Sequence, residues 1–465
     1  MRILIISFLI FFGANFLLGQ VFKDSVQTKI WSRNAKRDIV FSDWVNMPVR
    51  KISHLEGFAI QDPKKVNKYG SRMDFSGNKT GFFYKKKIGD RWTLFDPLGA
   101  VYYEVGVTSV RTGKSPLNKS TLTNQFGTEQ QWFSSTASLL LVNGFHSMGS
   151  WSDVLAAREY NKSAIDPIVY STQLSVLNAF NAFIRKEFPE RKISNIISLA
   201  LDPTFPAFCE KHLVEQAKFK DDPHLFGHFS DNELPFLIST WESIISADSK
   251  DLAFIAAMHF LDSLQINKMD ITKAQKEVFI ASIAETYFKV VSSSLKRVDP
   301  NHLYLGCRIH SSAKENIALL QVASKYVDIM SINYYGYWDL TEKLATLWSK
   351  YLQSPFFITE FYTKGDDAGM GNISGAGWIV KNQKDRAAHY ENFVLKLLNN
   401  KQCVGWHWFR YQDNDPADPS ADPSNKDANK GIVNTSYQPY LVLLGKMKEI
   451  HELKFHLIDY FDEKL

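Results

Sequence analysis

The sequence His228-Phe-Ser-Asp-Asn-Glu-Leu234 sets the architecture that we predict for the chain. It overlaps an apolar run, residues 225–229, which predicts a short buried strand. Glu233 therefore comes just after the carboxyl end of this strand, where a barrel keeps its reactive groups. The alternative is a helix capping box formed by Ser230 and Glu233, with Pro235 in the first helical turn.

A second stretch, Phe356-Phe-Ile-Thr-Glu-Phe361, repeats this arrangement. A short apolar strand again delivers one acidic residue, Glu360, at its carboxyl end. Glycosidases use two such carboxyl groups, one as an acid and the other as a nucleophile. Glu233 and Glu360 are therefore the predicted catalytic pair.

Outward from these two strands, apolar runs alternate with helical patterns along most of the chain. This alternation predicts an α/β fold, and the number of runs favours a closed (β/α)8 barrel, a TIM barrel, with a short N-terminal extension. The third strand is open between two runs. The predicted strands are residues 101–107, 145–148, 168–174 or 196–201, 225–229, 303–308, 326–333, 356–361 and 403–409.

The N-terminal residues predict export. Residues 1–20 begin with a basic residue and continue as an apolar run, which is typical of a secretory signal peptide, so we expect a secreted or periplasmic protein. Residues 21–90 are predicted to form an N-terminal extension with a β-hairpin, and residues 91–465 the barrel. No later stretch is apolar enough to predict a membrane span.

Composition excludes several classes of function. The formal net charge is +5 for 465 residues and the basic residues are scattered, so a nucleic-acid partner is not expected. The sequence has no dinucleotide-binding glycine pattern, no zinc-type cluster and no Gly-x-Ser-x-Gly, so we expect no cofactor and no metal.

The aspartates of loop 413–430 suggest a calcium site, but a solvated surface loop is the favoured interpretation. Cys209, Cys307 and Cys403 are predicted to be buried free thiols.

Candidate substrate contacts follow the carboxyl ends of the predicted strands. Many are aromatic, and flat rings pack well against the apolar faces of sugars, although a ring in the core is always the competing interpretation. His310 is equally compatible with an ordinary surface histidine. The candidates are Trp151, Asp153, His310, Asn333, Tyr334, Tyr335, Tyr362, Trp406, His407 and Trp408.

The last predicted strand contributes three of these candidates. Alternation along a strand places Trp406 and Trp408 on one face and His407 on the other. A ring near the carboxyl end of this strand is expected to form the floor of a sugar site, and the alternative is that both tryptophans are core residues.

Several short fragments together resemble glycoside hydrolase family 50, a family of β-agarases within clan A of the barrel glycosidases. The likeness spans roughly residues 91–440 in the same order, and the fragment after Gly405 is the most specific. The fragments are Asp96-Pro-Leu-Gly99, Gly149-Ser-Trp-Ser-Asp153, Phe229-Ser-Asp-Asn-Glu-Leu234, Thr359-Glu-Phe361, the helix start from Asn382 to Arg386, and Gly405-Trp-His-Trp-Phe-Arg-Tyr-Gln-Asp413.

The resemblance implies a retaining glycosidase that needs no metal. Glu233 matches the acid/base, Glu360 the nucleophile, and Asn232 the residue that hydrogen-bonds the sugar 2-hydroxyl; retention requires carboxyl groups about 5–5.5 Å apart. The implied substrate is a polysaccharide or oligosaccharide with β-galactosidic linkages, such as agarose. The alternatives are another β-glycan (porphyran, carrageenan, β-glucan or mannan) or a non-catalytic sugar-binding barrel.

Overall fold

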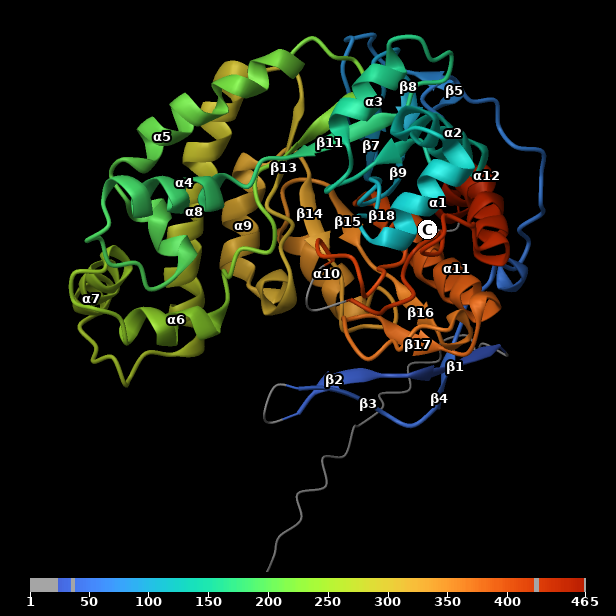
Figure 1. Cartoon of the computed structure of the whole chain (residues 1–465). Coiled ribbons are helices and arrows are strands. Elements are labelled where there is room, and N and C mark those ends of the chain that lie inside the picture. Colours follow the sequence, from blue (N-terminus) through green and yellow to red (C-terminus); the bar gives the residue numbers. More distant parts are fainter. Residues whose placement is uncertain (1–23, 35–37, 422–425, 464–465) are drawn as a thin grey trace, which may run out of the picture.

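The structure is a computed structural model that describes residues 24–34, 38–421 and 426–463. The predicted signal peptide, residues 1–20, lies outside the described residues. In the described part, helices surround a sheet of parallel strands, and short antiparallel strands cover parts of this core (Figure 1).

Eight parallel strands form the central sheet, in the order β13-β12-β11-β10-β9-β18-β15-β14. The two edge strands meet through a parallel bridge between Ile309 and Ile332, and the backbone N–H of Asn333 donates to the carbonyl oxygen of Ile309 at 2.9 Å. The sheet is thus nearly closed, and the predicted (β/α)8 barrel is confirmed. Its strands are β9 (Glu104–Val107), β10 (Ser147–Met148), β11 (Val169–Gln173), β12 (Leu225–Phe229), β13 (Leu303–Gly306), β14 (Met330–Asn333), β15 (Phe356–Glu360) and β18 (Cys403–Trp408).

Two strand predictions need correction. The run 101–107 is split, because β8 (Ala100–Tyr102) pairs antiparallel with β7 (Arg91–Phe95) in a separate sheet and only β9 enters the barrel. The alternative third strand is a 3-10 helix, η2 (Ile196–Leu201), whose first turn is capped by the side chain of Asn195. The third barrel strand is therefore β11.

Helices follow the strands and pack around the barrel, and α4 to α8 extend to one side of it (Figure 1). The longest is α8, which starts at a capping box between Thr272 and Gln275. Among the described helices it alone has the length and hydropathy to cross a membrane, and 56% of its most apolar window is buried in the fold. The helices are α1 (Pro116–Phe126), α2 (Glu129–Val142), α3 (Val154–Asn161), α4 (Val176–Glu187), α5 (Phe205–His212), α6 (Ile238–Ile245), α7 (Leu252–Leu264), α8 (Lys273–Val298), α9 (Ile317–Tyr326), α10 (Glu342–Tyr351), α11 (Gln383–Asn399) and α12 (Leu441–Glu463).

An antiparallel sheet closes the amino end of the barrel. Its order is β5-β8-β7-β6, with β5 at Arg72–Ser76 and β6 at Tyr84–Ile88, so it contains the predicted hairpin and crosses the domain boundary predicted after residue 90. Two residues of its strands and two that lie just before its strands pack against barrel side chains in one buried cluster, which makes this end a packed core. They are Tyr69, Phe83, Leu94 and Tyr102.

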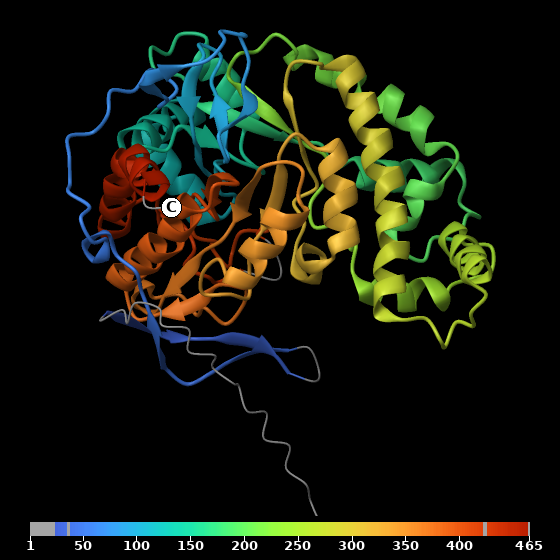
Figure 2. The ribbon, with the colours of Figure 1, turned by 180° about the vertical axis from the view of Figure 1, so that it is seen from behind.

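The first N-terminal strands lie at the other end of the barrel. β1 (Ser25–Lys29) joins β4 (Val45–Pro48) and two strands from the chain after β15, in the order β16-β17-β1-β4. These two strands are β16 (Thr363–Gly365) and β17 (Trp378–Val380). The segment between β4 and β5 then runs along the outside of the barrel past α11 and α12 to the opposite end (Figure 2). It is held there by hydrogen bonds such as the one from the backbone N–H of Ile52 to Glu391 of α11, at 2.8 Å.

Candidate active site

Glu360 is the last residue of β15 and is only 6% exposed. The Nη2 atom of Arg308 donates to its Oε1 at 2.6 Å, and the hydroxyl of Tyr335 donates to its Oε2 at 2.7 Å. Burial raises the pKa of Glu360 above its usual value, the Arg308 charge opposes this shift and the Glu233 charge adds to it. Two donors thus hold the carboxylate in one orientation, and the charge of the second carboxyl group affects its pKa.

Glu233 follows β12 in a left-handed backbone conformation, with φ of 52°. Its backbone N–H donates to the carbonyl oxygen of Cys307 at 3.0 Å, and Nδ2 of Asn333 donates to its Oε1 at 2.8 Å. The alternative interpretation as a capping box is wrong, because α6 begins only at Ile238 and the Ser230 hydroxyl is buried against Tyr304. A positive φ at Glu233 also differs from the backbone of a first helical turn.

Asn232, Asn333 and Arg308 link the ends of neighbouring strands. Nη1 of Arg308 donates to Oδ1 of Asn232 at 3.0 Å, and the hydroxyl of Thr359 donates to Oδ1 of Asn333 at 2.7 Å. Nδ2 of Asn333 also approaches Oδ1 of Asn232 at 3.3 Å. This network spans β12 to β15 and fixes the two carboxyl groups relative to each other.

Both carboxyl groups face one cavity of about 710 Å³. Burial lowers the pKa of His310 in its wall to about 4, so its imidazole is neutral at pH 7. Burial also lowers the pKa of Lys314 to about 8, which leaves the ammonium mostly charged at pH 7. Residues from seven parts of the chain line the cavity, among them Trp31, Arg33, Ile39, Glu233, His310, Lys314, Tyr335, Glu360, Tyr362, Gly375, Ala376 and Phe409.

A second cavity, of about 750 Å³, lies between α10, α11 and the β6–β7 hairpin and shares no residue with the first. Its acidic residues are Asp90, which is paired with Lys401 at 2.6 Å, and Glu342. Cavity size alone would favour this one slightly. Two carboxyl groups at strand ends, Glu360 buried and Glu233 half-buried, favour the first cavity as the reactive site.

The structure brings most of the predicted site residues together. Glu233, Glu360, His310, Tyr335 and Tyr362 line the cavity, and Asn232 and Asn333 belong to the network behind it. Trp151 is absent from the cavity wall, but its ring lies beside Arg308, whose guanidinium carbon is 6.0 Å from the ring centre. The substrate contacts of these residues stay predictions.

Three aromatic contacts were wrongly predicted. Trp406 and Trp408 are fully buried between the barrel and its helices, where their indole N–H groups donate to the Tyr390 hydroxyl at 2.7 Å and to the Lys430 carbonyl oxygen at 2.9 Å. Tyr334 is 2% exposed and donates to the carbonyl oxygen of Asp339. All three rings belong to the main core. Trp406 and Trp408 lie on the face of β18 that meets Tyr390 of α11, and Tyr334 directly follows β14.

His407 and Asp153 are not among the residues that line the cavity, and each has a structural partner. Nε2 of His407 lies 2.7 Å from Oε1 of Glu104 inside the barrel, where Gly106 and Gly149 leave room for the ring. Asp153 is the N-cap of α3 and accepts from the backbone N–H of Ala156 at 2.9 Å.

Other site residues were missed by the sequence analysis. Arg308 ends the predicted fifth strand, and this position was the available signal for it. Lys314 lies in a 3-10 helix (Ser311–Glu315) after that strand, and Trp31, Arg33 and Ile39 come from the N-terminal extension. For the last three, no motif in the sequence indicates proximity to the barrel.

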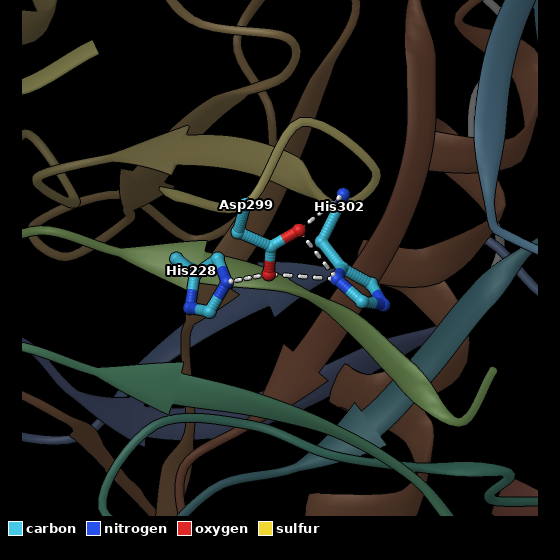
Figure 3. A group of neighbouring side chains, drawn as sticks. All are labelled: His228, Asp299 and His302. Carbon is cyan, nitrogen blue, oxygen red and sulfur yellow. Dashed lines mark hydrogen bonds and ion pairs between the residues drawn. The ribbon is translucent and has the colours of Figure 1, made fainter. Parts of the chain in front are cut away.

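Two groups of side chains resemble metal sites. His228, Asp299 and His302 form a buried cluster (Figure 3), but every ring nitrogen of the two histidines has a protein partner, including the Thr172 hydroxyl at 2.7 Å and the Asp222 carbonyl oxygen at 2.8 Å. Such a network stabilises the fold and leaves no lone pair aimed at an ion.

In loop 413–430, the described aspartates accept hydrogen bonds from the protein. Asp413, for example, accepts from the backbone N–H groups of Lys430 and Gly431. In the described parts of the loop, residues 413–421 and 426–430, this bonding occupies carboxylate oxygens that a calcium ion would need. The three cysteines are buried and free, as predicted.

No protein-family model matches the chain. Among solved structures, that of BpGH50 superposes with a TM-score of 0.84 and 30% sequence identity, over 94% of this chain and 96% of the other. An agarase, AgWH50C, superposes with a TM-score of 0.69 and 21% identity, over 85% of this chain and 67% of the other, which shows a shared fold.

Beta-agarase B of Vibrio sp. (strain JT0107) is 24% identical over 487 residues. The match covers 80% of this chain and 48% of that protein, so the chain spans about half the length of this relative. Beta-agarase A of the same organism is 27% identical over 221 residues, which cover 46% of this chain and 20% of that protein.

Proposed function

The chain belongs to glycoside hydrolase family 50, and we propose that it hydrolyses β-galactosidic linkages of an algal galactan such as agarose. The relatives named as agarases support this substrate class. The observation that carries the proposal is that Glu233 and Glu360 face one cavity from the carboxyl ends of two barrel strands.

The proposed reaction is a double displacement with retention. In the first step the Glu360 carboxylate attacks the anomeric carbon while the Glu233 carboxyl group gives its proton to the departing glycosidic oxygen, so a galactosyl ester forms on Glu360. In the second step Glu233 takes a proton from water, the water oxygen attacks the anomeric carbon, and the bond to Glu360 breaks. No other group needs to donate or accept a proton.

The side chains around Glu360 suit this role. Arg308 and Tyr335 each donate to one carboxylate oxygen, which favours the anion and aims it. Asn333 donates to Glu233 and fixes the acid relative to the nucleophile. Positioning of this kind lowers the activation free energy, because the reacting groups are already held in the geometry that the reaction needs.

A sulfated galactan is the second candidate substrate. Arg33 and Lys314 line the same cavity, and cations there would attract a sulfate group on a sugar.

We also propose that residues 1–20 direct export, since their basic start and apolar run are typical of a signal peptide, and a polymer is cleaved outside the cytoplasm.

The test is incubation of the purified protein with agarose and porphyran oligosaccharides, reading product size by chromatography and the anomeric form of fresh products by NMR. We expect cleavage of at least one galactan with the β-anomer appearing first. First appearance of the α-anomer would contradict retention, and absence of cleavage on every galactan would contradict the proposed function.

A further inference from the structure

The N-terminal strands are built into the wall of the catalytic cavity. β1 pairs antiparallel with β17 (Trp378–Val380), with Thr28 opposite Val380, and the hydroxyl of Thr28 donates to the carbonyl oxygen of Ile379 at 2.8 Å. β17 itself follows the loop after Glu360. The next two strands, β2 (Trp31–Arg33) and β3 (Ile39–Phe41), form a pair beside this sheet (Figure 1).

One face of the β2–β3 pair borders the cavity. Trp31, Arg33 and Ile39 line it, whereas their neighbours Ser32 and Val40 are paired with each other and exposed. Side chains alternate along a strand, so the first set lies on one face and the second on the other. The strand pair therefore has one face toward the cavity and one toward solvent. The half-buried indole of Trp31 lies on the cavity face.

Contacts on both sides hold this face in place. Trp31 packs against a cluster that includes Val26, Trp338 and Trp378. Nζ of Lys364 lies 4.7 Å from the ring centre of Phe41 and donates to the carbonyl oxygen of Ser374 at 2.8 Å. Since Gly375 and Ala376 also line the cavity, Lys364 ties the strand pair to the loop that completes the wall.

We propose that Trp31 is a sugar-stacking residue that determines specificity, holding a ring of the galactan chain in a subsite next to the reacting sugar. The proposal rests on the proposed function and extends it to a segment outside the barrel. Trp31 shares the cavity with the rings of Tyr335, Tyr362 and Phe409. A pyranose has two apolar faces, so a chain threading this cavity meets aromatic surface from the barrel and from β2.

The experiment compares two apolar replacements of Trp31 in a Glu360→Gln background, where substrate binds without being consumed. Trp31→Phe keeps a flat ring, and Trp31→Leu keeps apolar contact with the cluster behind it without a ring. Val40→Ala, on the opposite face, is the matched control. Affinity for an agarose hexasaccharide is measured by calorimetry, melting temperature is measured for each variant, and KM and kcat are measured in the active background.

We expect Trp31→Leu to weaken binding about 10-fold, Trp31→Phe by less than about 3-fold, and Val40→Ala not at all, with the loss in active enzyme appearing in KM. Equal effects of Trp31→Phe and Trp31→Leu, or a loss confined to kcat, would show that Trp31 only supports the fold and would overturn the proposal. Unchanged affinity in both would overturn it as well. Failure of the proposed function is distinct, because the wild-type protein would then cleave no galactan.

Discussion

The two ends of the barrel place buried carboxylates in different surroundings. At the carboxyl end, Glu360 is bonded by Arg308 and Tyr335 yet still borders a cavity of about 710 Å³. Within the barrel, Glu104 is enclosed, since His407 and the Tyr102 hydroxyl contact its two oxygens at 2.7 and 2.5 Å and aromatic side chains close the amino end. Burial of an acid therefore does not identify a reactive group; burial beside an open cavity at a strand end does.

The largest effect should come from the carboxyl groups at the open end. Glu360→Gln and Glu233→Gln should each lower kcat by about 10³-fold or more, because each removes a group that acts on the reacting atoms. Glu315→Gln is the matched control, since Glu315 lines the same cavity but is bonded to Lys343 and Tyr337. Rates are measured from new reducing ends on agarose oligosaccharides. Similar losses in all three variants would remove the distinction between the carboxyl groups.

A substitution at the closed amino end of the barrel should lower the stability of the protein and leave its activity unchanged. Phe83 is 1% exposed and packs against Tyr69, Tyr102 and Phe226, so Phe83→Ala should lower the free energy of unfolding by about 3 kcal/mol. Urea denaturation measures this loss, and kcat per folded molecule should stay within about 2-fold of wild type. A large fall in kcat with unchanged stability would show that the two ends are coupled.

Arg308 allows a test of the electrostatics at the open end. Its charge lowers the pKa of Glu360, so Arg308→Met should raise that pKa and move the acidic limb of the kcat/KM profile to higher pH. Loss of the donor should also lower kcat/KM by about 30-fold at the optimum. Arg308→Lys keeps the charge and should shift the limb less. An unchanged acidic limb in Arg308→Met would mean that Glu360 is not the group that must be ionised.

The smallest effect should come from Asp231, which directly precedes Asn232 at the carboxyl end of β12 and is fully buried. Burial raises its pKa to about 7, while hydrogen bonds from Tyr287 and Leu177 oppose the shift. The folded state therefore holds a proton that the unfolded state has released, and stability falls as pH rises from about 4 through 7. Relative to Asp231→Asn, wild type should lose on the order of 1 kcal/mol between pH 6 and pH 8. Parallel pH curves for the two proteins would contradict this pKa.

The sequence predicts well those features that follow from short-range patterns. The apolar run 225–229 gives β12 with its observed bounds, and the position of Glu233 and Glu360 after such runs places both at one end of the barrel. Barrel geometry then requires that they lie near each other. The residue types at strand ends are therefore informative about the position of the site.

The wrong predictions arise where a sequence pattern is compatible with two structures. Alternation separates Trp406 and Trp408 from His407, but it does not say which face meets the helices, and here the tryptophans do. Trp31 was missed for another reason: its distance from Glu360 in the chain is large, and only the pairing of β1 with β17 brings it to the cavity. Long-range pairing of short strands carries little local signal.

The central claim, that Glu360 attacks the sugar with Glu233 as its acid, is tested most directly by trapping the intermediate. The enzyme is treated with an agarose disaccharide that carries a fluorine at the 2-position of the reacting galactose and an activated leaving group, then digested and sequenced by mass spectrometry. We predict one label per molecule, on the peptide that contains Glu360, and none in Glu360→Gln. A label on another residue, or undiminished labelling of Glu360→Gln, would contradict the account.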